Sequence, residues 1–243
     1  MLFAIVKIRQ LSRSSKMRLF IGDGIMRFKI TGDHRKVLEK QKFIEFEDVF
    51  TLDEIETASK HVDQVLAKRA RQLIDTQSCQ QLYREGRDLW RDDPVLENFV
   101  CNRGLAQLNA QLFQQTTLYL AFDQALRTTV ATGYPGANTA TLQERSCIQP
   151  LVGAVLIRLS GEAHPLSMLP KKRENAVLIG PNLIIPWEIF FQEPKCSFLL
   201  IAYAPAKALY VCEKHDPNLH FLKKLGYGFG DNLNTNYHPL LYK

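Results

Sequence analysis

The sequence lacks the cysteine pattern of a disulfide-stapled or a zinc-binding protein. Its 243 residues include five cysteines, an odd number, and no two of them have CxxC spacing. Disulfide frameworks and zinc sites need paired or clustered cysteines, so the pattern argues against both. We predict a reducing, cytoplasmic environment, in which Cys147 and Cys212, each within an apolar run, are buried thiols.

Long apolar stretches are missing as well. No run approaches the roughly 18 residues of a membrane span, and the apolar segment Met1 to Val6 is too short for a signal peptide. We therefore expect no membrane association. Residues 1–30 form a basic leader in which all charges before Asp23 are positive. This leader is either disordered or not native, or else it is an arm for nucleic acid or another anionic surface.

The familiar catalytic motifs are also absent. The sequence contains no P-loop, HExxH motif, nucleophile elbow or dinucleotide fingerprint. Gly226, Gly228 and Gly230 do not form a phosphate loop, because no strand-to-helix context and no Lys-Ser/Thr pair accompanies them. They instead predict left-handed backbone or close backbone approach. The residue pattern alone therefore assigns no reaction.

Apolar residues are plentiful, at 46% of the chain, which is enough for a substantial core. We predict one domain over residues 31–243. Branched and aromatic residues bounded by Gly and Pro predict short buried strands within Glu174 to Glu213. These strands need a facing sheet, which Cys147 to Leu159 can supply. The predicted strands are Ala176 to Ile179, Leu183 to Ile185, Ser197 to Ala204 and Ala208 to Cys212.

Helices are predicted before these strands. Thr51 and Glu54 have the spacing of a capping box, and apolar residues then recur at helical spacing to Leu66. Asp93-Pro94 predicts the start of another helix, whose buried face continues to Leu112.

Positive charge supports a weaker hypothesis. The chain has a net charge of +6, and Lys171-Lys172-Arg173 forms a basic cluster. Such a cluster is typical of a solvated loop or of nucleic-acid contact. Arg84, Arg87 and Arg91 fall at helical spacing and predict a salt-bridged surface.

A set of segments carries a family resemblance. The segments are Phe43–Phe46, Asp48-Val49-Phe50, Thr51 to Leu66, Gly86 to Trp90, Leu118 to Gln124, Leu199 to Ala204, and the tail from Asp216-Pro217 through Gly230-Asp231 to His238-Pro239. They resemble the phytanoyl-CoA dioxygenase-like branch of the Fe(II)/2-oxoglutarate oxygenases, and a group of bacterial hypothetical proteins with that fold. The resemblance implies an α+β fold, a double-stranded β-helix (jelly roll) with flanking N-terminal helices.

The resemblance also implies iron held by two histidines and one carboxylate. A His-x-Asp or His-x-Glu motif belongs in residues 123–146, which contain no histidine, and the second histidine belongs at 186–188, which read Pro-Trp-Glu. Lys195 is the nearby cation for the oxoglutarate carboxylate. No catalytic, cofactor-binding or metal-binding residue can be carried over. Asp123, Trp187 and Glu188 are the candidate pocket-lining residues.

Three functions stay open. The first is a non-catalytic binding or regulatory protein, a pseudoenzyme with no cofactor and an unknown partner. The second is a divergent dioxygenase that uses Fe(II) and 2-oxoglutarate at a displaced site. His215, His220 and His238 in the tail are either a metal-binding cluster or plain surface and turn residues. The third is a metal-responsive DNA-binding regulator.

Overall fold

The computed structural model describes residues 30–71, 73–129, 139–162, 166, 168–192 and 196–243. The predicted basic leader, apart from Ile30, lies outside these residues, and so does Lys195. The prediction that the leader is disordered or binds an anionic surface therefore stays a prediction.

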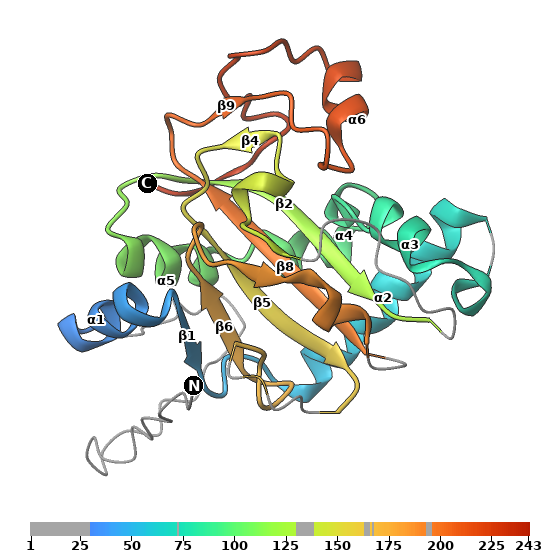
Figure 1. Ribbon diagram of the computed structural model, residues 1–243, viewed down its shortest axis with the longest axis horizontal. Helices are drawn as coiled ribbons and strands as arrows, with labels where there is room; N and C mark the ends of the chain where they lie inside the picture. Colours follow the sequence, from blue (N-terminus) through green and yellow to red (C-terminus); the bar gives the residue numbers. More distant parts are fainter. Residues whose placement is uncertain (1–29, 72, 130–138, 163–165, 167, 193–195) are drawn as a thin grey trace.

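A six-stranded antiparallel sheet forms the centre of the molecule (Figure 1). Its strand order is β1-β6-β5-β8-β2-β10, so strands that are distant in sequence are neighbours in space. The strands are β1 (Phe43–Phe46), β2 (Leu118–Arg127), β5 (Gly153–Ser160), β6 (Ala176–Ile179), β8 (Ser197–Ala204) and β10 (Leu240–Tyr242).

Two small antiparallel sheets accompany the large one. The first pairs β3 (Thr139–Ala140) with β7 (Ile185–Pro186), and the second pairs β4 (Ile148–Gln149) with β9 (Leu209–Tyr210). Their strands alternate along the chain with those of the large sheet, so the chain passes repeatedly between the sheets. The fold is thus mixed helix and sheet with a curled antiparallel sheet.

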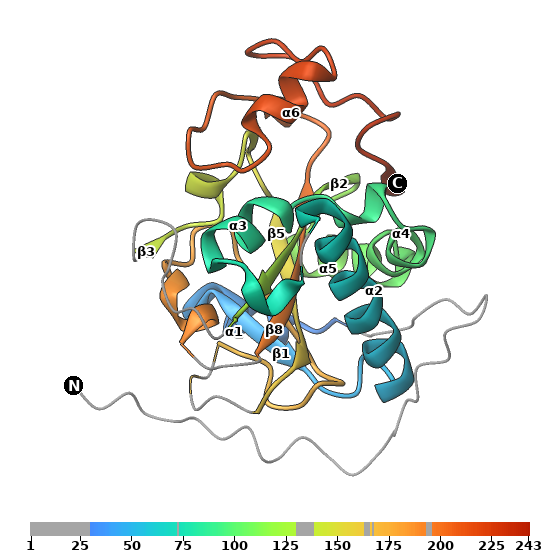
Figure 2. The same ribbon diagram turned by 90° about the vertical axis from the view of Figure 1, so that its right-hand side faces the viewer.

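Helices cover one face of the large sheet, as Figure 2 shows with α2, α3 and α5 in front of the strands. The helix α1 lies beside β1 at one edge (Figure 1). The α-helices are α1 (Gly32–Gln41), α2 (Leu52–Ala70), α3 (Cys79–Glu85), α4 (Pro94–Val100), α5 (Arg103–Phe113) and α6 (Leu219–Lys224).

Buried apolar residues form two clusters, one on each face of the sheet. Successive strand residues point to opposite faces, so Val155 packs in the helix-facing cluster and Leu156 packs in the other. The helix-facing cluster includes Ile55 of α2, and the opposite cluster includes Trp187 and Phe190. We name the latter the inner cluster. Both faces of the central strands carry apolar side chains, because each face is buried in one of the two clusters.

The local signals for helix starts are confirmed. Thr51 caps α2, with the Glu54 carboxylate accepting from the Thr51 backbone N–H at 2.8 Å and the Thr51 hydroxyl accepting from Glu54 N. Asp93 caps α4, with Pro94 at its first position. The prediction of a single helix to Leu112 is wrong, because Asn102 caps a second helix, α5, and interrupts the first.

Three other predictions from the sequence need correction. Arg87 does not lie on an exposed helical face, because α3 ends at Glu85 and the Arg87 side chain is buried. Cys147 is buried as predicted, whereas Cys212 is exposed. The strand predicted from Leu183 begins only at Ile185, because Leu183 N donates to the carbonyl of Gly180 in a turn.

The segments around β9 and α6 form a lobe at the top of both views. Gly226 and Gly230 have φ values of 96° and 87°, so the predicted left-handed backbone is confirmed at these two positions. None of the helices in the described ranges is both long and apolar enough to cross a membrane.

Candidate functional site

The small sheet of β3 and β7 brings together the two segments in which the resemblance places metal ligands. Ala140 pairs with Ile185, and Thr139 pairs with Pro186. The chain then enters the short helix η4 (Trp187–Phe191). The two segments therefore meet at this sheet, where Trp187 contacts Ala140.

Trp187 fills the end of the inner cluster next to this sheet. Its side chain is only 2% exposed, and its indole N–H donates a hydrogen bond of 3.0 Å to the carbonyl of Ala140. The ring meets Tyr83 edge-on at a centroid distance of 6.5 Å and lies tilted against Phe190 at 5.8 Å. Trp187 is therefore a packed core residue whose polar atom is satisfied.

Asp123 lies on the opposite, helix-facing side of the sheet. It is fully buried on β2, opposite Ile201, and its two carboxylate oxygens accept from the backbone N–H groups of Leu89 and Trp90. Burial, together with the charge of the neighbouring Asp88, raises the pKa of Asp123 to about 7. Asp123 therefore holds the 88–90 segment against the sheet.

Glu188 follows Trp187 in η4 and is half-buried. Its Oε2 atom is buried and has no hydrogen-bond partner among the described residues. The three candidate residues are thus divided, with Trp187 and Glu188 at the inner end and Asp123 across the sheet.

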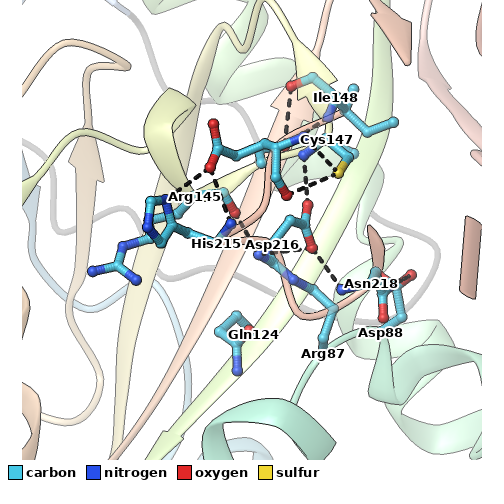
Figure 3. Close-up of polar contacts among 12 residues, drawn as sticks. Arg87, Asp88, Gln124, Arg145, Cys147, Ile148, His215, Asp216 and Asn218 are labelled. Carbon is cyan, nitrogen blue, oxygen red and sulfur yellow. Dashed lines mark hydrogen bonds and ion pairs between the residues drawn. The ribbon is translucent and has the colours of Figure 1, made fainter. Parts of the chain in front are cut away.

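A buried polar network that the sequence did not reveal joins the segment after α3 to residues 145–147 and 216–218 (Figure 3). Arg87, only 2% exposed, donates from Nη2 to the carbonyl of Arg145 at 2.7 Å and lies 3.5 Å from Oδ1 of Asp216. Its guanidinium carbon lies 3.6 Å from the centroid of the Phe122 ring. Nε and Nη1 of Arg87 have no hydrogen-bond partner in the described part of the chain.

Asp216 connects the C-terminal lobe to this network. Its Oδ2 accepts from the backbone N–H of Cys147 at 2.6 Å, and its Oδ1 accepts from that of Asn218 at 2.7 Å. Burial raises the pKa of Asp216, while the charge of Arg87 and these hydrogen bonds oppose the rise. Asn218 also donates to Asp88 at 2.6 Å, which ties the lobe to the segment after α3.

A pocket of about 380 Å³ opens beside this network. It lies between β3, the short helix η3 (Gln143–Arg145) and the 212–215 segment. Arg145 is only 3% exposed, yet it borders this pocket. The lining residues are Thr139, Ala140, Glu144, Arg145, Cys212, Glu213, Lys214 and His215.

Two acidic residues of the pocket hold fixed positions. Oε1 of Glu213 accepts from Nδ1 of His215 at 2.8 Å and also from the His215 backbone N–H at 3.0 Å. Oε2 of Glu144 accepts from the backbone N–H of Thr141 at 2.7 Å and from its hydroxyl at 2.9 Å. These bonds lower the pKa of Glu144, so it is ionised at neutral pH.

The predicted histidine cluster in the tail does not form. His215 and His220 are exposed, whereas His238 is buried, with Nδ1 3.1 Å from the carbonyls of Leu120 and Ala121. Across the residues that the structure describes, no group of three His, Cys, Asp or Glu side chains is placed to hold a metal ion.

The basic loop is partly neutralised. Lys171 lies 3.2 Å from Glu45, and Arg173 lies 3.5 Å from Glu56. Nucleic-acid binding therefore stays a prediction, because two of the three cations in this loop already face acidic side chains.

Solved structures with a similar fold include enzymes that are described as non-heme and alpha-ketoglutarate-dependent. The non-heme alpha-ketoglutarate-dependent carbocyclase SnoK from nogalamycin biosynthesis is 12% identical, with a TM-score of 0.65 over 87% of this chain and 96% of that one. The epimerase SnoN from the same biosynthesis is also 12% identical, with a TM-score of 0.59 over 86% of this chain and 97% of that one. EctD from S. alaskensis, solved with bound Fe, is 13% identical, with a TM-score of 0.54 over 75% of this chain and 79% of that one.

These likenesses show that the chain shares its overall fold with these proteins. The sequence itself has no significant match among protein-family models or curated proteins. At identities this low, structural similarity shows the fold alone, so function has to be argued from the site.

Proposed function

We propose that this protein is a non-catalytic binding module, built on a double-stranded β-helix of the phytanoyl-CoA dioxygenase-like type. The observation that carries the proposal is the contact between Trp187 and Ala140. These residues stand at the two segments where the resemblance places imidazole and carboxylate ligands, and they join them by an indole-to-carbonyl hydrogen bond of 3.0 Å.

The residues at this junction do not fit an iron(II) centre. Iron of this kind is held by imidazole and carboxylate groups. An indole N–H is a hydrogen-bond donor and has no lone pair to offer a metal. Residues 130–138, which lie outside the described structure, contain no His, Cys, Asp or Glu in their sequence. We therefore propose that the protein functions without an iron(II) centre.

The feature that supports binding is the pocket that Thr139 and Ala140 border at the same junction. Its volume of about 380 Å³ falls at the lower end of the roughly 300–1,000 Å³ of small-molecule sites. Its lining contains charged groups held by hydrogen bonds, such as Glu213 and His215. A preformed, charged pocket of this size supports the binding of a small polar molecule.

Oxygen-dependent turnover of 2-oxoglutarate tests the proposal. The purified protein would be incubated with Fe(II), ascorbate, 2-oxoglutarate and air, and released succinate would be measured against a sample without protein. We expect no succinate above that background. Multiple turnovers that stop when oxygen is removed would establish the alternative, a divergent dioxygenase with a displaced metal site.

A further inference from the structure

A second pocket lies in the lobe around β9 and α6, which stands at the top of Figure 1. Its volume is about 300 Å³, at the lower limit of the roughly 300–1,000 Å³ of small-molecule sites. All of its lining residues fall between Leu225 and Tyr237, so it does not include the β3–β7 junction. We name it the lobe pocket. The polar residues that line it are Tyr227, Asp231, Asn232, Asn234 and Tyr237.

The tight turn from Gly228 to Asp231 fixes a carboxylate at the lobe pocket. Oδ2 of Asp231 accepts from the backbone N–H of Gly228 at 2.7 Å. Both backbone groups of Tyr210 in β9 hold this turn, since Gly230 N donates to the Tyr210 carbonyl and Tyr210 N donates to the Asp231 carbonyl, each at 2.8 Å. Oδ1 of Asp231 has no hydrogen-bond partner among the residues that the structure describes, so it can accept from a ligand.

Tyr227 supplies a hydroxyl donor. Its side chain is 8% exposed, and the rings of Tyr210, Tyr237 and His238 pack around its ring at centroid distances of 5.6, 6.2 and 5.7 Å. The hydroxyl end is therefore the part that can border the pocket. Its oxygen accepts from the backbone N–H of Asn234 at 2.7 Å, and within the described ranges its hydrogen has no acceptor. Burial raises the pKa of Tyr227, so the hydroxyl keeps this hydrogen at neutral pH.

Two amide side chains complete the polar lining. Asn232 forms an isolated β-bridge with Leu209, which fixes its backbone, and its side chain makes no hydrogen bond to any other described residue. Oδ1 of Asn234 accepts from the backbone N–H of Asn236 at 2.9 Å, which leaves the amide hydrogens of Asn234 for a ligand. An amide offers both donors and an acceptor without a charge. The lobe pocket thus combines neutral donors and acceptors with one carboxylate.

The charges around the lobe pocket disfavour an ionic ligand. None of its lining residues is a cation, so an anion would face Asp231 without compensation. A cation would face Arg91, which donates to the carbonyl of Tyr237 at 2.6 Å. Tyr227 and Tyr237 already meet edge to face, so they leave no aromatic cage for an ammonium group. Calcium sites gain affinity with the charge count of their ligands, and Asp231 is the single acid of the lining.

We propose that the lobe pocket binds an uncharged polyhydroxylated molecule, a monosaccharide or a polyol. Its hydroxyl groups donate to Oδ1 of Asp231 and accept from Tyr227 and from the amides of Asn232 and Asn234. Each hydroxyl group both donates and accepts, which matches the mixed lining. This inference goes beyond the proposed function, because the lobe pocket shares no residue with the pocket at the β3–β7 junction.

NMR titration of the ¹⁵N-labelled full-length protein in the presence of EDTA tests the assignment. The probes are glucose, galactose, mannose, ribose, sorbitol and myo-inositol, with gluconate and glucosamine as the anionic and cationic analogues. We expect at least one neutral probe to shift amide resonances of residues 225–237 in a saturable manner, and both charged analogues to bind more weakly than that probe. Tighter binding of gluconate or glucosamine would overturn the assignment. So would shifts that rise linearly without saturation, as for an excluded osmolyte, or no shifts at all.

Two variants locate the site. Asn232→Ala should weaken binding of the responding probe about tenfold, through the loss of its hydrogen bonds, and should leave Tm unchanged. Asn236→Ala is the matched control, because Asn236 lies in the same segment outside the lining and keeps its backbone N–H bond to Asn234. Asp231→Asn keeps an oxygen for the N–H of Gly228 but loses the carboxylate, and should also bind more weakly. If Asp231→Asn disturbs the turn, Asn232→Ala decides alone, and equal affinities of Asn232→Ala and Asn236→Ala contradict the site.

Discussion

The indole N–H of Trp187 lies 3.0 Å from the carbonyl oxygen of Ala140 and closes the junction between β3 and β7. The two residues are 47 positions apart in sequence, and each stands where the resemblance to oxygenases places a metal-binding segment. Packing of the indole against Tyr83 and Phe190 makes this end of the inner cluster an apolar core. The junction is therefore a structural contact as well as the basis of the functional proposal.

Replacing Trp187 separates the contribution of its hydrogen bond to stability from that of its ring packing. Trp187→Phe keeps an aromatic ring but removes the N–H, leaving the Ala140 carbonyl without its partner, and should lower the free energy of unfolding by about 1–3 kcal/mol. Trp187→Ala also leaves a cavity and should cost about 3–5 kcal/mol. Urea denaturation followed by circular dichroism measures both. Equal stability of the three proteins would show that the indole is not a core residue.

The buried pair of Arg87 and Asp216 should behave as one unit. Removing either charge alone leaves the other buried without compensation, so Arg87→Met and Asp216→Asn should each destabilise by about 3–5 kcal/mol. The double variant should lose less than the sum, because neither charge then remains. Chemical denaturation of all four proteins gives the coupling energy. Strict additivity would mean that the pair, 3.5 Å apart, does not interact energetically.

Asp123 should make stability decrease with rising pH. Its pKa is raised from 3.8 to about 7 in the folded protein, so the folded state binds a proton that the unfolded state has released. Stability from this group is therefore greatest below about pH 4 and is lost as pH rises to about 7. Arg69 opposes the shift and Asp88 increases it, but neither cancels the effect of burial.

The comparison of the native protein with Asp123→Asn isolates this effect. Between pH 5 and pH 8 the native protein should lose about 2–3 kcal/mol of stability relative to the variant, since asparagine does not titrate. Asp216 titrates in both proteins, so its contribution cancels in the difference. Parallel pH profiles would contradict a raised pKa at Asp123.

Gly86 is required by close backbone approach between α3 and β2. A Cβ atom there would lie 2.7 Å from the carbonyl oxygen of Ala125 and 2.8 Å from that of Leu82. Gly86→Ala should therefore destabilise by about 1–3 kcal/mol through overpacking. Gly32→Ala is the matched control, since nothing lies within 4 Å of its Cβ position, and its effect should stay within about 0.5 kcal/mol. Similar Tm losses in both variants would contradict this account.

The sequence predicted the features that depend on local chemistry. The caps at Thr51 and Asp93 were visible because a capping box and an Asp-Pro start act within three or four residues. The strands β6 and β8 were visible because both of their faces are buried, which leaves continuous apolar runs. The helix break at Asn102 was missed because apolar residues at helical spacing follow it, at Leu108 and Leu112.

The site could not be predicted because its residues are joined only by the tertiary fold. Arg87 reads as a surface cation at helical spacing, and its burial depends on Phe122 and Asp216, which are distant in sequence. Asp123 and Trp187 lie on opposite faces of the sheet, and this separation follows only once the face to which each residue of β2 points is known. A bulge between Leu120 and Phe122 changes which residues of β2 face the helices, and no sequence signal marks it.

Anaerobic calorimetric titration of the chelator-treated protein with Fe(II), alone and with 2-oxoglutarate, tests the central claim most directly. If Trp187 and Ala140 replace a metal centre, Fe(II) should give no saturable one-to-one heat, and 2-oxoglutarate should not change this. Tight one-to-one iron binding that 2-oxoglutarate strengthens would show that the scaffold holds the metal of its structural relatives, and the account would be wrong.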